Sequence, residues 1–81
     1  MKSKEKHIDE FSSFKKLYKL SKPRSPLFVE FMTEDLPDEW LIDIVRYKRK
    51  SGIVAENFMI LQKEIDTWMK GYKEKGWVII D

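Results

Sequence analysis

Cysteine is absent from the sequence, and His7 is its single histidine. Without cysteine, the chain has no disulfide, no thiol nucleophile and no cysteine-based zinc or iron–sulfur site. One histidine cannot build a multi-histidine metal centre, and its place near the amino terminus predicts a surface residue. We therefore expect neither a metal nor another cofactor.

Long hydrophobic runs are also missing. No apolar run is longer than five residues, whereas a membrane-spanning helix needs about 20. The amino terminus is charged and lacks the apolar core of a signal peptide. We therefore expect a cytoplasmic protein without a membrane partner.

The sequence has few of the features that mark an enzyme. It contains no glycine-rich phosphate loop, no Walker motif and no nucleophile elbow. Its paired acids, Glu34 with Asp35 and Asp38 with Glu39, flank Pro37 at a predicted helix start, where acids commonly act as caps. General acid–base catalysis needs carboxylates with different environments in one pocket. We therefore predict that the protein is not an enzyme.

What the sequence does contain is enough apolar material for one hydrophobic core. The chain has 81 residues, of which 42% are hydrophobic and eleven are aromatic. This length predicts a single domain over residues 1–81. Residues 1–6 alternate in charge and offer no core side chain, so we expect them to fray.

The most regular pattern lies between Val54 and Tyr72. Its apolar residues are spaced by 4, 3, 4, 3 and 4 positions, which would place them on one face of an α-helix. The stripe predicts a helix over 53–75 that covers the core, with Trp68 at its centre. The same spacing also suits a coiled-coil seam, although it spans fewer than three heptads. The residues of the stripe are Val54, Phe58, Leu61, Ile65, Trp68 and Tyr72.

Two further helices and two strands are predicted. Apolar spacing indicates helices over 7–21 and 38–50, the first ended by Pro23 and the second entered through Pro37. Alternating side chains indicate a strand at 27–32, and the apolar residues at 77–80 form its candidate partner. We therefore predict a mostly helical α+β fold with three helices, in which these two short strands pair.

Positive charge is concentrated in two segments. Residues 1–24 carry eight lysines and arginines against three acids, while residues 25–81 carry eight against eleven. Such asymmetry is typical of a surface for an anionic partner. A structural alternative exists, because basic residues at a helix carboxyl end also stabilise the helix dipole. The candidate nucleic-acid-binding residues are Lys15, Lys16, Lys19, Lys22 and Arg24, followed by Arg46, Tyr47, Lys48, Arg49 and Lys50.

A loose motif spans about residues 36–77. It consists of the run Leu36-Pro37-Asp38-Glu39-Trp40-Leu41, then Asn57-Phe58, Trp68, Tyr72 and Gly76-Trp77. Together these residues resemble the helical single-strand-binding domain of primosomal (DnaT-like) and phage replication accessory proteins. The resemblance implies a helical domain that binds single-stranded DNA.

These observations predict a small, non-catalytic binding module with one of two partners. The first is nucleic acid, contacted through the basic residues by an accessory protein of replication or transcription. The second is a larger protein, on which the chain would dock as an interaction or inhibitor module of the phage or regulatory type. A homodimer is left open. The placement of the two basic segments distinguishes the alternatives, because both must lie on one surface to grip one nucleic acid.

Overall fold

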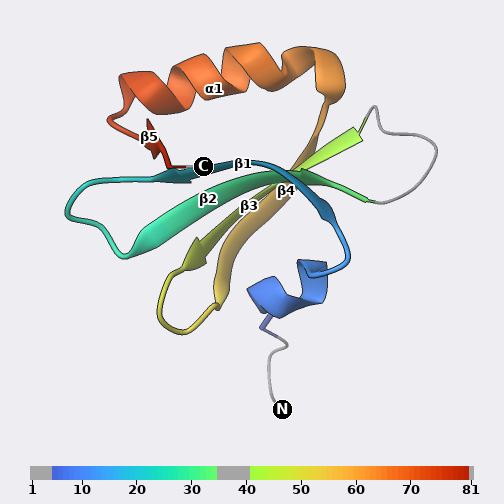
Figure 1. The fold of residues 1–81 in the computed structure, drawn as a ribbon, viewed down its shortest axis with the longest axis vertical. Coiled ribbons are helices and arrows are strands. Elements are labelled where there is room, and N and C mark those ends of the chain that lie inside the picture. The colour runs from blue at the N-terminus through green and yellow to red at the C-terminus, as the bar shows by residue number, and fades with distance from the viewer. Residues whose placement is uncertain (1–4, 35–40, 81) are drawn as a thin grey trace.

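An antiparallel β-sheet is the main element of the protein. The computed structural model describes residues 5–34 and 41–80. Their five strands form one sheet in the order β4-β3-β2-β1-β5, and Figure 1 shows α1 lying across one of its faces. The elements in chain order are η1 (Ile8–Phe11), β1 (Lys15–Ser21), β2 (Leu27–Thr33), β3 (Leu41–Lys48), β4 (Val54–Leu61), η2 (Gln62–Glu64), α1 (Ile65–Glu74) and β5 (Val78–Ile79).

Neighbouring strands in the chain are neighbours in the sheet for the first four strands. In the register, Leu20 of β1 lies opposite Val29 of β2, which in turn lies opposite Arg46 of β3. β5 extends the sheet beyond β1, where Ile79 lies opposite Leu20. A β-bulge interrupts the pairing of β3 with β4, because the register shifts by one residue near the start of β4.

Two hydrophobic clusters lie on opposite faces of the sheet. Successive side chains of a strand point to opposite faces, so β2 contributes Phe31 to one cluster and Met32 to the other, both fully buried. The cluster under α1 contains Leu20, Val29, Phe31, Ile42, Ile44, Ile60, Met69 and Trp77. The cluster on the side of η1 contains Phe11, Met32, Val45 and Tyr47.

The predicted helix over 53–75 is wrong in its first half. Residues 54–61 form strand β4, and the helix α1 begins only at Ile65. Phe58 and Ile60 of β4 pack under α1, so alternate residues share a face there, as in a strand. Trp68, expected at the centre of the core, is 39% exposed. The helical spacing of the stripe therefore combines residues from two different elements.

The predicted helices over 7–21 and 38–50 are also wrong. The first segment forms the short 3-10 helix η1 and then strand β1, and the described part of the second forms strand β3. In β3, the buried residues Ile42 and Ile44 alternate with the half-buried Asp43. Residues 38–40 lie outside the described residues. The fold is thus mostly β, because long-range strand pairing overrides the local helical spacing.

The strand predicted at 27–32 is present as β2, and the one at 77–80 is present in part as β5. Their predicted pairing is wrong, because β1 lies between them in the sheet. The helical spacing of residues 7–21 conceals β1, so the sequence alone does not indicate a five-stranded sheet. The fraying predicted for residues 1–6 falls mostly on residues outside the described part of the chain.

Candidate nucleic-acid interface

Two hairpin loops lie at the same end of the sheet. One joins β1 to β2 over residues 22–26, and the other joins β3 to β4 over residues 49–53. The register places Leu27 opposite Lys48, and the backbone N–H of Arg49 donates to the carbonyl of Pro26 at 2.8 Å. These contacts hold the two loops side by side. We call the cations of this region the basic end: Lys19, Lys22, Arg24, Lys48, Arg49 and Lys50.

The two basic segments of the sequence meet at Phe28. Lys19 Nζ lies 4.6 Å from the centre of the Phe28 ring, and Arg49 Cζ lies 5.5 Å from it. Both distances are typical of cation–π contacts. Tyr47 also contacts Phe28, and the two rings meet edge-on with their centres 5.9 Å apart. Phe28 is not among the predicted site residues, although it connects the two basic segments.

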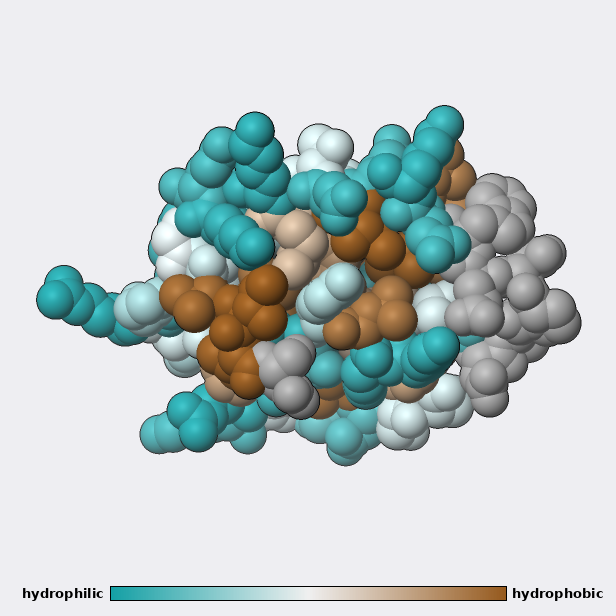
Figure 2. Space-filling model, turned by 45° about the horizontal axis from the view of Figure 1, so that its top comes forward, coloured by the Kyte–Doolittle hydropathy of each residue, from teal (hydrophilic) through white to brown (hydrophobic). Residues whose placement is uncertain are grey.

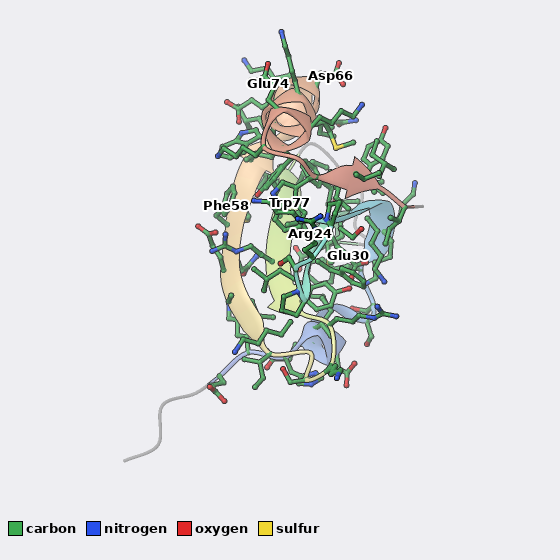
Figure 3. All side chains as sticks on the ribbon, turned by 90° about the vertical axis from the view of Figure 1, so that its left-hand side faces the viewer. Arg24, Glu30, Phe58, Asp66, Glu74 and Trp77 are labelled. Carbon is green, nitrogen blue, oxygen red and sulfur yellow. The ribbon has the colours of Figure 1, made fainter. Side chains whose placement is uncertain are left out.

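The charge of the basic end is not neutralised by carboxylates of the described residues. Within residues 5–34 and 41–80, no ion pair involves any of its six cations. Figure 3 views this end of the molecule and shows Arg24 well separated from Asp66 and Glu74, which lie on α1. The basic end therefore offers positive charge to an anionic ligand.

The other predicted site residues lie elsewhere or are already engaged. Lys16 Nζ is 3.8 Å from the buried Glu30 carboxylate, and an Arg46 nitrogen is 3.1 Å from Glu56. Lys15 lies opposite Thr33, at the far end of β1 from the basic end. Tyr47 is buried. Six of the ten predicted residues thus lie at or beside the two loops, and four lie elsewhere. Of the six, Lys19 and Arg49 share the Phe28 ring, whereas Lys22 Nζ lies 6.0 Å from the centre of the Trp77 ring.

The buried ring of Tyr47 is tied to Glu30. Burial raises the pKa of the Tyr47 hydroxyl far above its usual range, and its hydrogen bond to Glu30 adds to the rise. The hydroxyl therefore stays protonated and acts as a donor to the carboxylate. The buried ring of Tyr47 packs against Phe28, so it is unavailable for stacking on a nucleobase.

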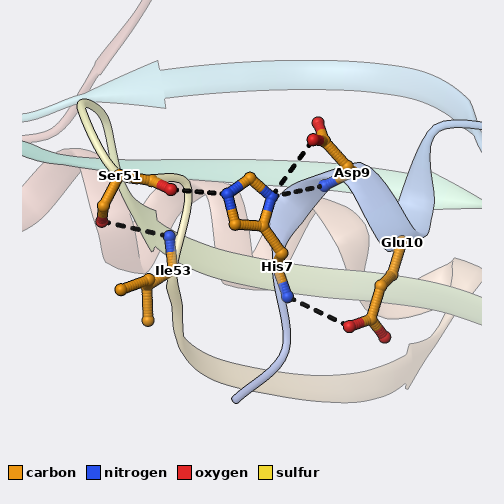
Figure 4. Close-up of polar contacts among 5 residues, drawn as sticks. All are labelled: His7, Asp9, Glu10, Ser51 and Ile53. Carbon is orange, nitrogen blue, oxygen red and sulfur yellow. Dashed lines mark hydrogen bonds and ion pairs between the residues drawn. The ribbon is translucent and has the colours of Figure 1, made fainter.

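His7 fastens the loop that joins β3 to β4, and Figure 4 shows its contact with Ser51 of that loop. The Nε2 of His7 lies 2.5 Å from the carbonyl oxygen of Ser51, and the N–H of Asp9 points to Nδ1 at 3.3 Å. A carbonyl can only accept, so Nε2 is the donor to Ser51, while Nδ1 also lies 3.3 Å from the carboxylate of Asp9. The N–H of Ile8 donates to the Gly52 carbonyl at 2.7 Å. The sequence pattern does not reveal this role, because Ser51 lies 44 positions from His7.

We predict that the stability of the fold depends on pH through Asp43, the acidic residue of β3. Burial raises the pKa of Asp43 above 3.8, while its hydrogen bond to Asn57 acts in the opposite direction. The folded state then holds the Asp43 proton more tightly than the unfolded state. Its contribution to stability is therefore largest below pH 3.8 and declines as the pH rises through the folded-state pKa.

Replacing Asp43 by asparagine is expected to raise the melting temperature at neutral pH, because the half-buried charge is removed. The gain should disappear below pH 3.8, where the wild-type carboxyl is protonated in both states. Thermal unfolding at both pH values measures this, with Glu74→Gln on the exposed side of α1 as the control. A variant that melts below wild type at neutral pH would contradict the prediction.

A second surface feature lies on the face of the sheet that α1 covers. The α1–β4 groove, of about 620 Å³, runs between the helix and the outer strand. Aromatic side chains of both elements line it, with the Arg46–Glu56 ion pair at one end. The residues that line it are Arg46, Glu56, Asn57, Phe58, Thr67, Trp68, Gly71, Tyr72 and Lys75.

The carboxyl-terminal strand adds an exposed apolar surface. Val78 is 50%, Ile79 38% and Ile80 47% exposed. Figure 2 shows apolar side chains gathered at this edge of the molecule. These side chains lie over β5. Since α1 has Met69 and Lys73 on its β5 side, this apolar surface and the α1–β4 groove lie on opposite sides of α1.

Comparison with protein-family models, with curated proteins and with solved structures finds no match. In the described part of the chain, no helix is long and apolar enough to cross a membrane. The same residues contain no group of three or more histidines and acids arranged to hold a metal ion.

Proposed function

We propose that the protein is a non-catalytic nucleic-acid-binding module whose basic end contacts the phosphate backbone. The observation that carries the proposal is the convergence of Lys19 and Arg49 on the ring of Phe28. These residues come from separate basic segments, and neither has a carboxylate partner among the described residues. Convergence on one surface is what a shared anionic ligand requires.

The geometry suits recognition of phosphates more than of bases. Lysine and arginine side chains on two adjacent loops can each meet a phosphate, and such contacts carry no sequence information. The Phe28 ring is bracketed by Lys19 and Arg49, so it positions these cations and is not a free stacking platform. The proposed binding is therefore weakly sequence-dependent and strongly salt-dependent, as for an accessory protein of replication or transcription.

The proposal does not use the resemblance to helical single-strand-binding domains. Asn57 and Phe58, which belong to that motif, lie in strand β4, and Leu41 begins strand β3. The alternative partner, a larger protein, would use a different surface: the α1–β4 groove with its aromatic side chains, or the exposed apolar residues of β5. At the basic end, Lys19 and Arg49 instead meet on one ring, and neither has a carboxylate partner among the described residues.

The triple variant Lys19→Gln, Arg49→Gln, Lys50→Gln is expected to weaken nucleic-acid binding. It should also flatten the dependence of log K on log salt concentration by roughly 0.7–0.9 for each phosphate that the variant no longer neutralises. Fluorescence anisotropy at several salt concentrations, with single- and double-stranded DNA and RNA, measures both quantities.

The matched control is Lys63→Gln, Lys70→Gln, Lys73→Gln, which removes the same charge from exposed positions of η2 and α1. It should leave the salt slope near that of wild type. Equal losses of affinity in both triple variants would show that binding depends only on the net charge of the protein, and would refute a localised site. Absence of wild-type binding to all four nucleic acids at low salt would refute the function itself.

A further inference from the structure

The outer edge of β4 is open beyond its first residue. The N–H of Val54 donates to the carbonyl of Lys6 at 2.8 Å, but from Ala55 to Ile60 no strand of the described residues pairs with this edge. Natural edge strands are commonly guarded by lysine or proline. The sequence of β4, VAENFMIL, has neither, and the lysine beside it is Lys6, whose Nζ lies 3.4 Å from the side-chain oxygen of Asn57. Its single charge, Glu56, is paired with Arg46 of β3.

Apolar side chains flank this edge on both faces of the sheet. On the α1 side, the ring centre of Phe58 lies 5.0 Å from that of Trp68, which is 39% exposed. Figure 3 shows Phe58 on the outer strand, below α1. On the opposite face, Met59 is 64% exposed. A strand added to β4 would cover both side chains, and its residue opposite Phe58 would point into the α1–β4 groove.

Gly71 has no role within its own chain that requires glycine. It lies in the interior of α1 with an ordinary helical backbone, where glycine is less favourable than alanine by about 1 kcal/mol. A Cβ added at this position would have no atom within 4 Å. The missing side chain instead widens the α1–β4 groove, which Gly71 lines. This is the expected position for glycine where another chain approaches the helix closely.

We propose that the occupant of this edge is a second copy of the protein, paired through β4 in antiparallel orientation. A two-fold axis perpendicular to the sheet would place Phe58 opposite Phe58 of the second copy and join the two sheets. Both α1 helices then lie on the same side, and the two α1–β4 grooves face each other. Such isologous dimers are the commonest oligomers.

The charges of β4 do not oppose pairing with a second copy. In this register Glu56 lies opposite Ile60 of the second copy, so the only charged residue of the strand does not meet itself. Glu56 is also neutralised by Arg46 in its own chain. The pairing therefore brings together two largely apolar strands without like-charge repulsion between them. The basic end, on the hairpin loops, stays free, so this inference is independent of the proposed function.

Two variants test the dimer by analytical ultracentrifugation over a dilution series. Gly71→Leu fills the groove, and Met59→Lys places a charge on the open edge. Each is expected to raise the dimer dissociation constant at least about tenfold, which corresponds to about 1.4 kcal/mol. Gly71→Leu should also keep or raise the melting temperature measured at concentrations where wild type is monomeric, because leucine favours the helix.

Opposite changes in association and monomer stability distinguish a disrupted interface from a misfolded chain. The control is Ile80→Lys, which charges the exposed apolar surface next to β5 and should leave the dissociation constant unchanged. Dissociation by Ile80→Lys but not by Met59→Lys would place the interface on β5 and refute the proposal. A wild-type protein that stays monomeric at its highest soluble concentration would refute it as well.

Discussion

Replacing Phe31 by alanine is expected to lower the free energy of unfolding by about 3–5 kcal/mol. Phe31 is fully buried, and its ring meets those of Tyr18 and Tyr72 edge-on, with centres 6.3 and 5.9 Å apart. It therefore connects β1, β2 and α1, and its removal leaves a cavity at the junction of all three. Urea unfolding followed by circular dichroism measures the loss.

Trp68→Ala is the informative comparison, because the sequence alone places Trp68 at the centre of the core. At 39% exposure on the rim of the α1–β4 groove, it loses less buried area. We expect less than about 2 kcal/mol for this larger truncation. If Trp68→Ala cost more than Phe31→Ala, the helix would be the main source of stability, in place of the sheet.

The second large effect is expected for Gly52→Ala, with a loss of about 2–4 kcal/mol in the free energy of unfolding. Gly52 has a φ of +72°, in the left-handed region that favours glycine, and a Cβ there would overlap the ring of His7. The substitution therefore strains the β3–β4 loop and displaces the ring that fastens it. Thermal and urea unfolding measure the loss.

A double-mutant cycle with His7→Ala separates these two causes. Removing the ring eliminates the overlap but leaves the backbone strain, so the double variant should be more stable than the sum of the single effects predicts. The coupling is expected to be about 1–2 kcal/mol. Strict additivity would show that the ring is not in contact with Gly52.

Local features of the fold could be predicted from the sequence, while its pairing could not. Strand β2 is predictable because apolar residues occupy both of its faces, as in a strand covered on both sides. The stripe from Val54 to Tyr72 is misleading because Val54 and Phe58, four positions apart, also suit a helix. Whether such a segment becomes a strand depends on a partner, here β3, whose identity as a strand is hidden by its own helical spacing.

The candidate site could be predicted only in part for a related reason. The run from Arg46 to Lys50 forms one cluster only if it lies at the end of a helix. In β3, however, Arg46 faces α1 while Tyr47 faces η1, since neighbouring strand residues point to opposite faces. Lys19 and Arg49 approach each other only because β2 lies between their strands and presents Phe28. No local spacing contains that information.

The order of strands in the sheet has a consequence for how the chain folds. β1 to β4 pair with their neighbours in sequence, so these hairpins form at a small entropic cost of loop closure. β5 must instead find β1 across the rest of the sheet, and the Lys6 carbonyl must find Val54 across three strands. We therefore expect both ends of the described chain to join last and to open first. The central hairpins would form before them and provide the sheet on which they dock.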